Sequence, residues 1–308
     1  MAPGNSVNVI VVGAGSIGSR HQKILRQLGH EVLIVSSMSP DAKFKTLKDA
    51  LDDIQTEYVV VANSTSQHFE TYSTLLEKKF SGRVLIEKPI FGQSHKLENN
   101  EFSISAVGYN LRFHPAIQWL RDNLSKIGTI CSADLYVGQY LPNWRPESDY
   151  RVSSSALKIS GGGVLRDLSH ELDLVQNFFG DWQRLTAIGG KLSNLDISTE
   201  DTFSILMQTK NCTVVSVHLN YLDRIKQRKI TINGNNGTID IDLIANSAKI
   251  DDDEVKFSVE PDLTYIAQHQ AVISGNSQDL CSLEAGLELV KTIEAIEKSA
   301  RKQKWVFK

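Results

Sequence analysis

The stretch from residue 11 to residue 21 reads VVGAGSIGSRH, and its two valines end the apolar run VNVIVV. A glycine cluster in this spacing is weak evidence alone, because glycines gather in turns for steric reasons. Here the cluster follows a predicted strand and opens a predicted helix, so backbone N–H groups and the positive helix end would face a diphosphate. The stretch therefore predicts a dinucleotide-binding loop. Its cofactor-binding residues would be Gly13, Gly15, Ser16, Ile17 and Gly18.

The first 125 residues alternate short apolar runs with helical segments, the pattern of a parallel sheet covered by helices. The expected strands are VNVIVV, EVLIVS, YVVVA, RVLIE and SISAV, which are nearly all apolar because helices would cover both sheet faces. A helix from about 16 to 28 can end at Gly29 in the left-handed conformation. One further brief helix is expected between Pro89 and Gly108. Residues 1–125 are thus predicted to form an α/β domain with a doubly wound parallel sheet.

Residues 126–308 differ, because segments that alternate apolar and polar residues become frequent: TFSILMQ, TVVSVHL, KITIN and TIDIDLI. The link NGNNG at 233–237 is typical of a hairpin turn. These features predict an α+β substrate-binding domain with a mostly antiparallel open sheet that buries one face. A last helix, at about 280–300, is expected to pack back on the first domain.

Composition excludes several classes of protein. The net charge is −3 and the 33 basic residues are scattered, so neither nucleic acid nor an anionic membrane is an expected partner. No apolar stretch has the length of a membrane span, and the first residues lack a basic signal-peptide region. The three cysteines lie far apart without a CxxC pair, so neither a disulfide framework nor a thiolate zinc site is predicted, and a reducing cytoplasmic location is expected. No metal site is predicted. Four isolated histidines are interpreted as surface or packed residues: His30, His95, His218 and His269.

The end of the second strand bears on the choice between NAD and NADP. An acidic residue there would hold the ribose 2′-hydroxyl of NAD, but LIVSSMSP offers Ser36 and Ser37. These hydroxyls, with Lys43 or Lys45 nearby, favour the 2′-phosphate of NADP. Asp41 is close enough in sequence to leave NAD open.

Two further segments carry candidate chemistry. Lys88, in IEKP, would end a buried strand where parallel sheets bind ligands, and desolvation can make such a lysine an electrophile or proton donor. The alternative is a surface lysine that caps a strand. SGGGVLRDLSHELDLV, at 160–175, is expected to contain a helix on which Asp167 shares a face with His170 and Glu171. A carboxylate beside an imidazole suits a general acid/base, although a solvated helix face has the same composition.

Five motifs in order along the chain together resemble the glucose-fructose oxidoreductase / inositol dehydrogenase (Gfo/Idh/MocA) family. They are the glycine loop with His21, ANSTSQH at 62–68, EKP at 87–89, GYNLRFHP at 108–115 and GGGVLRDLSHELD at 161–173. The resemblance implies a Rossmann domain, an open sheet that often forms oligomer contacts, and hydride transfer between NAD(P) and a sugar-like substrate. A homodimer or homotetramer is expected on the same ground.

The resemblance also implies roles for individual residues. Lys88 would be the catalytic lysine and Asp167 the acidic partner at the start of the catalytic helix. The cofactor pocket would be lined by Asn63, Ser64, His68, Glu87 and Lys88.

The catalytic helix departs from the commoner family pattern, in which a histidine stands four residues after the aspartate. In this chain His170 comes three residues after Asp167, and Glu171 occupies the position four residues after it. Either His170 or Glu171 could be the acid/base. His170 is favoured, because a near-neutral pKa serves proton exchange with an alcohol better.

The segment GQYLPNWRPESDYR at 138–151 concentrates aromatic side chains that can stack on sugars and guanidiniums that pair with anions. The alternative is an ordered loop with prolines. With LSHE, the segment resembles a branch of surface-polysaccharide sugar enzymes. The predicted substrate-binding residues are Asn110, Arg112, Trp144, Arg145, Tyr150, Arg151 and Glu171.

The sequence therefore predicts an NAD(P)-dependent oxidoreductase that interconverts a secondary alcohol and a ketone on a sugar or nucleotide sugar. Two alternatives stay open. One is a dinucleotide-binding regulator of the same fold without catalysis, and the other is a reductase of a non-sugar ring.

Overall fold

The computed structural model describes residues 6–40 and 42–308, which divide into two compact units. The first unit runs to Phe113 and includes Pro261–Val290, and the second comprises His114–Glu260 and Lys291–Lys308. In these described ranges no helix has both the length and the apolar character needed to cross a membrane.

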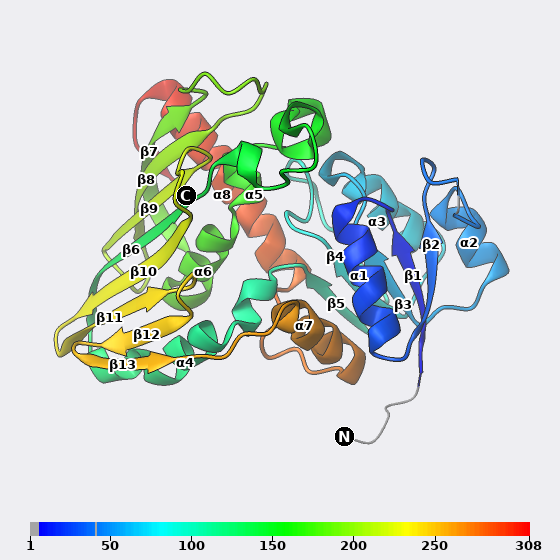
Figure 1. Ribbon diagram of the computed structural model, residues 1–308, viewed down its shortest axis with the longest axis horizontal. Helices are drawn as coiled ribbons and strands as arrows, with labels where there is room; N and C mark the ends of the chain where they lie inside the picture. The colour runs from blue at the N-terminus through cyan, green and yellow to red at the C-terminus, as the bar shows by residue number, and fades with distance from the viewer. Residues whose placement is uncertain (1–5, 41) are drawn as a thin grey trace. The chain divides into compact units, whose positions relative to one another are not determined.

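The first unit is built on a five-stranded parallel sheet in the order β2-β1-β3-β4-β5 (Figure 1). This confirms the predicted parallel sheet. The strands are β1 (Asn8–Val12), β2 (Glu31–Val35), β3 (Tyr58–Val61), β4 (Arg83–Ile86) and β5 (Ile104–Val107). The helices that precede Pro89 are α1 (Ser16–Gln27), α2 (Leu47–Asp53) and α3 (His68–Glu77), with a 3-10 turn, η1 (Thr65–Gln67).

Local signals placed most of these elements correctly. Gly29 follows α1 with a φ of +87°, as expected of a residue that ends a helix in the left-handed region. The brief helix expected between Pro89 and Gly108 was wrong, because the chain runs from Pro89 to β5 without one. Gly92 and the pair Asn99–Asn100 favour turns over helix in that segment.

Helix α7 (Leu263–Ser274) belongs to the first unit although it lies far along the chain. Its Ala271 and Val272 join one apolar core with Val11, Val60 and other residues of β1 and β3. The helix also contacts α1 and β4. The sequence predicted a single domain boundary between residues 125 and 126. The division into units differs, because Pro261–Val290, which follows the second sheet in the chain, belongs to the first unit.

The second unit contains a nine-stranded sheet in the order β13-β12-β11-β10-β6-β9-β8-β7-β14. Every neighbouring pair is antiparallel except β6 and β9, which are parallel. The mostly antiparallel sheet is therefore confirmed. Its strands are β6 (Ile130–Gly138), β7 (Trp182–Gly190), β8 (Thr202–Thr209), β9 (Val214–Asn220), β10 (Gln227–Gly234), β11 (Gly237–Asp242), β12 (Ser247–Ile250), β13 (Asp253–Lys256) and β14 (Val306–Phe307).

The predicted hairpin is present between β10 and β11. Gly234 pairs with Gly237, so Asn235 and Asn236 form a two-residue turn. Buried and more exposed residues alternate along β8, as a sheet with one covered face requires.

The short helices of the second unit are α4 (Pro115–Asn123), α5 (Val164–Asp167) and α6 (His170–Phe179), and the long helix α8 (Leu283–Lys302) continues into it from the first unit. The 3-10 turns of the second unit are η3 (Leu124–Ile127), η4 (Leu141–Asn143), η5 (Tyr150–Val152), η6 (Ser154–Ala156) and η7 (Lys158–Ser160). One further 3-10 turn, η2 (Asn110–Phe113), ends the first stretch of the first unit. Residues of α8 up to Val290 belong to the first unit, where a Cβ on Gly286 would lie 2.6 Å from Val107 Cγ2.

Candidate functional site

The glycine loop between β1 and α1 is packed so tightly that two of its glycines admit no side chain. Gly13 has a φ of +111°, and a Cβ there would lie 2.5 Å from the carbonyl oxygen of Ala62. A Cβ on Gly18 would lie 2.1 Å from the carbonyl oxygen of Gly13. Gly15 is the opposite case, because a Cβ there would meet nothing within 4 Å. The loop therefore presents open space at Gly15, beside the first turn of α1, which contains no acidic residue.

The end of β2 places Ser36 and Ser37 beyond Val35. The Ser36 hydroxyl oxygen accepts hydrogen bonds from the backbone N–H groups of Met38 and Ser39, so it shapes its own turn. Ser37 is exposed. The Lys45 ammonium donates to the Ser39 carbonyl oxygen at 2.6 Å. Lys43 Nζ lies 3.4 Å from the Asp53 carboxylate, and Asp41 lies outside the described residues.

The residues after β3 form a buried polar corner around His68. One ring nitrogen, Nε2, lies 3.1 Å from the Asn63 carbonyl oxygen, and the other, Nδ1, lies 3.1 Å from that of Pro89. Burial lowers the pKa of His68. Asn63 donates from Nδ2 to Thr71, while its buried Oδ1 has no hydrogen-bond partner among the described residues. Ser64, which precedes η1, is exposed.

Glu87 and Lys88 follow β4 at the carboxyl edge of the parallel sheet. Glu87 is 8% exposed, and its Oε2 accepts a hydrogen bond from the Lys88 backbone N–H. Its Oε1 lies 2.9 Å from His21 Nε2. Burial raises the pKa of the Glu87 carboxyl, but His21 and Lys88 outweigh burial and leave the pKa below its ordinary value. Glu87 is therefore a buried carboxylate that keeps its charge.

Asn110 and Arg112 lie in η2 and are both buried. Asn110 donates to the Thr264 hydroxyl at 2.7 Å, and Arg112 donates to the Leu280 carbonyl oxygen at 3.2 Å. These bonds tie η2 to segments around α7 within the first unit. Their predicted role in substrate binding stays a prediction.

In the second unit, the expected helix through SGGGVLRDLSHELDLV is interrupted. Helix α5 ends at Asp167 and α6 begins at His170, with a turn at Leu168 and Ser169 between them. The Ser169 hydroxyl donates to the Arg166 carbonyl oxygen, a local bond that competes with regular helix. The prediction of one continuous helix through Asp167, His170 and Glu171 was therefore wrong.

Asp167 is held by a residue that the sequence did not single out. The hydroxyl of Tyr221, which is fully buried, donates to Asp167 Oδ2 at 2.6 Å. Burial and the neighbouring Asp167 charge raise the pKa of Tyr221 well above its ordinary value, so it stays a donor. The Trp144 ring meets the Tyr221 ring edge to face, with centroids 5.2 Å apart. Trp144 thus contacts the residue that holds Asp167.

Glu171 is 1% exposed and forms an ion pair with Arg228 of β10. Arg228 Nε donates to Oε1 at 2.6 Å and Nη2 donates to Oε2 at 2.9 Å. Both carboxylate oxygens are thus engaged by one guanidinium. His170, the neighbouring residue in sequence, is 9% exposed.

The 138–151 segment forms an ordered loop with mixed environments. Tyr150 accepts a hydrogen bond from the Asp196 backbone N–H, and Arg151 pairs with Asp149 at 2.8 Å. Arg145 is exposed. The Arg224 guanidinium lies 3.4 Å from the centre of the Tyr140 ring, a cation–π contact that the sequence did not indicate.

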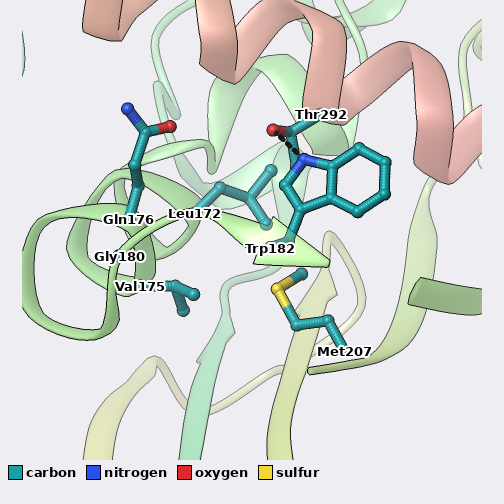
Figure 2. Close-up of a pocket in the computed structure, with 7 residues that line it drawn as sticks. All are labelled: Leu172, Val175, Gln176, Gly180, Trp182, Met207 and Thr292. Carbon is teal, nitrogen blue, oxygen red and sulfur yellow. Dashed lines mark hydrogen bonds between the residues drawn. The ribbon is translucent and has the colours of Figure 1, made fainter. Parts of the chain in front are cut away.

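A small pocket beside α6 is apolar and contains none of the predicted site residues (Figure 2). Trp182 Nε1 donates to the Thr292 hydroxyl at 3.0 Å, which ties β7 to α8. The pocket is lined by Leu172, Val175, Gln176, Gly180, Trp182, Met207 and Thr292. Its walls serve to pack α6 on the sheet.

Sequence reasoning missed Tyr221, Arg228 and Arg224. Each is remote in sequence from the residue it contacts, and no local spacing marks it. The only signal was composition, since the segment LNYLDRIKQR gathers basic and aromatic residues after an alternating strand.

Two family models match the chain. Residues 7–100 match the model described as Oxidoreductase family, NAD-binding Rossmann fold, and residues 121–240 match the GFO/IDH/MocA C-terminal domain. No curated protein sequence matches the chain significantly.

Solved structures with the same fold cover nearly the whole chain. GenD2 from gentamicin A biosynthesis in complex with NAD is 20% identical with a TM-score of 0.78, covering 100% of this chain and 98% of its own. Levoglucosan dehydrogenase in complex with NADH is 17% identical with a TM-score of 0.84, covering 98% and 99%. The WlbA dehydrogenase from Bordetella pertussis, in complex with NADH and UDP-GlcNAcA, is 20% identical with a TM-score of 0.78, covering 99% of each chain.

Proposed function

This chain belongs to the Gfo/Idh/MocA family of NAD-binding oxidoreductases, and from that premise we propose that it interconverts a secondary alcohol and a ketone on a sugar or nucleotide sugar. The observation that carries the proposal is the shared edge of the parallel sheet. The glycine loop follows β1 and Glu87–Lys88 follows β4, and parallel strands bring their carboxyl ends to one edge, where such sheets bind ligands.

The residues at this edge fit a nicotinamide dinucleotide. Gly13 and Gly18 have no room for a Cβ, which lets the backbone turn tightly, while the open space at Gly15 admits a diphosphate. The buried Oδ1 of Asn63 is an acceptor without a partner among the described residues. The bound dinucleotide would supply or accept the hydride.

The protein side chains would handle the charge and the proton. Lys88 would stabilise negative charge on the substrate oxygen. His170 would take the hydroxyl proton during oxidation and return it during reduction, with Asp167 as its acidic partner. The hydrogen bond from Tyr221 orients Asp167. The Arg228 ion pair engages the Glu171 carboxylate, which supports His170 over Glu171 as the acid/base.

The cofactor preference and the substrate complete the proposal. Ser36 and Ser37, in place of a carboxylate, favour NADP over NAD, whereas the neighbours described above were crystallised with NAD or NADH. A sugar-like substrate fits the aromatic and arginine residues of the 138–151 loop. We expect a homodimer or homotetramer, which sedimentation of the purified protein would measure.

Cofactor binding is tested by titrating NADH and NADPH while following their own fluorescence. Gly15→Ala should leave the unfolding temperature unchanged, because a Cβ there meets no protein atom, but it should weaken nucleotide binding about tenfold or more by filling the space for the diphosphate. Unchanged nucleotide binding in this variant would contradict the proposed diphosphate site at Gly15.

The chemistry is tested by measuring turnover on a panel of sugars and nucleotide sugars. Lys88→Met and His170→Ala should each lower turnover by at least ~100-fold while leaving NADH affinity nearly intact. An active His170→Ala variant together with an inactive Glu171→Gln variant would reverse the assignment. Tight NADH binding without turnover across the panel would favour the non-catalytic regulator.

A further inference from the structure

Four side chains from four separate segments form one continuous chain of hydrogen bonds inside the first unit. The Tyr58 hydroxyl of β3 lies 2.9 Å from His269 Nδ1 of α7. His269 Nε2 lies 2.8 Å from His21 Nδ1 of α1, and His21 Nε2 lies 2.9 Å from Glu87 Oε1 at the end of β4. Residues separated by more than 200 positions are thus joined through their polar atoms.

The chain has one buried end and one end at the cofactor edge of the sheet. Tyr58, His269 and His21 are each 0% exposed, and Glu87 is 8% exposed. The Tyr58 end lies in the apolar core with Val60 and Leu85.

Only one arrangement of protons satisfies all three bonds with neutral histidines and an ionised Glu87. The carboxylate accepts only, so His21 must donate from Nε2 and accept at Nδ1. His269 must then donate from Nε2 and accept at Nδ1, where the Tyr58 hydroxyl donates. Reversing every bond would need a protonated Glu87 and would send the Tyr58 proton outside the chain.

The charges around the chain agree with this arrangement. Burial lowers the pKa of His269 well below its ordinary value, which keeps its ring neutral. Burial, with the charge of Glu87, raises the pKa of Tyr58 well above its ordinary value. Tyr265 of α7 meets the His21 ring edge to face at 5.5 Å and carries the Arg20 guanidinium over its own ring.

We propose that His21, His269 and Tyr58 are positioning residues that hold Glu87 as an oriented anion at the nicotinamide end of the cofactor site, where it favours the oxidised cofactor over the reduced one. The proposal rests on the proposed function, since it needs a nicotinamide dinucleotide at this edge. The oxidised ring carries a positive charge that the reduced ring lacks. A fixed carboxylate near it therefore stabilises the oxidised form selectively, as unlike charges attract.

The first test measures the proton arrangement directly. Long-range ¹H–¹⁵N NMR spectra of protein labelled at histidine distinguish the two neutral tautomers from the imidazolium, and His21→Gln and His269→Gln assign the signals. His269 is expected as the neutral Nε2–H tautomer at pH 7, and His21 is expected to carry a proton on Nε2. An Nδ1–H tautomer at either position, or an imidazolium at His269, would overturn the arrangement.

The second test measures dissociation constants for NAD⁺ and NADH by calorimetry, without substrate. Lys88→Met serves as the background, so that the lysine charge does not offset the carboxylate. Adding Glu87→Gln should weaken NAD⁺ relative to NADH about tenfold, which corresponds to about 1.4 kcal/mol. Tyr58→Phe in otherwise unaltered protein should weaken NAD⁺ binding relative to NADH binding about threefold. It should also move the NMR signals of His269.

Tyr72→Phe is the matched control for Tyr58→Phe. Tyr72 is also 0% exposed in the first unit, but its hydroxyl donates to the Glu98 carbonyl oxygen, outside the chain. This variant should leave the ratio of the NAD⁺ and NADH dissociation constants and the His269 signals unchanged.

If the protein binds both nucleotides and Glu87→Gln leaves this ratio unchanged, the inferred role of Glu87 fails. If the protein binds neither nucleotide, the proposed function fails with it.

Discussion

Replacing Arg228 by methionine is expected to destabilise the second unit strongly, because it leaves the buried negative charge of Glu171 without its partner. Glu171 is 1% exposed, and both of its carboxylate oxygens accept hydrogen bonds from Arg228, at 2.6 and 2.9 Å. Methionine keeps the unbranched stem of arginine and removes the guanidinium. The variant therefore tests the charge pairing more than the packing.

The magnitude follows from the burial of the pair. The Arg228 and Glu171 side chains are 18% and 2% exposed, so water replaces little of the lost interaction. Removing one partner of a buried ion pair costs about 3–5 kcal/mol, whereas replacing both partners by apolar residues is often nearly neutral. Arg228→Met should fall in that range, and the double variant Glu171→Leu/Arg228→Met should recover most of the loss.

Tryptophan fluorescence during urea unfolding measures this unit selectively, because all four tryptophans, at 119, 144, 182 and 305, belong to it. Lys249→Met is the matched control. Lys249 pairs with Asp240 at 3.2 Å on the same sheet, but the two side chains are 47% and 37% exposed. Its loss should cost less than about 1 kcal/mol.

Two results would refute this reasoning. One is an Arg228→Met variant no less stable than Lys249→Met, which would mean that Glu171 is solvated or paired elsewhere. The other is a double variant as unstable as the single one, which would assign the loss to packing instead of charge.

Three further predictions concern the first unit. Gly18→Ala should lower the free energy of unfolding by about 1–3 kcal/mol and also weaken NADH binding, because its Cβ would lie 2.1 Å from the Gly13 carbonyl oxygen; differential scanning calorimetry and NADH titration would show both effects or contradict the close packing. Gln268→Leu should raise the unfolding temperature, since both amide atoms of Gln268 are buried without a hydrogen-bond partner in the part of the chain that the structure describes; a lower temperature would reveal a missed partner. Stability should fall as the pH drops below about 6.5, because unfolded His269 binds a proton that the folded state, with its lowered pKa, does not; His269→Gln should make this slope shallower, and an unchanged slope would contradict the assignment.

The features predicted correctly from the sequence are those whose cause is local. The five parallel strands were found because continuous apolar runs alternate with helical segments, and the β10–β11 turn because Gly234 and Gly237 flank two asparagines. The end of α1 just before Gly29 depends on the backbone freedom of that glycine. The interruption between Asp167 and His170 was missed, because helical spacing continues through Leu168 and Ser169.

The arrangement of the candidate site was less predictable. His269 looked isolated in sequence, yet it is one of the two inner members of a buried hydrogen-bond chain. The pairing of Glu171 with Arg228 was not predictable either, because no local pattern places β10 beside α6.

The sequence by itself determined the class of the protein: a glycine loop between an apolar strand and a helix, a lysine at a strand end, and a family resemblance. These are signals read over a few residues, where backbone sterics and side-chain periodicity act directly. Only the tertiary structure decided which charges are paired, that α7 completes the first unit, and that Tyr221 and Arg228 hold the carboxylates of α5 and α6. Burial and hydrogen bonding between distant segments depend on how the whole chain packs, and no local pattern encodes them.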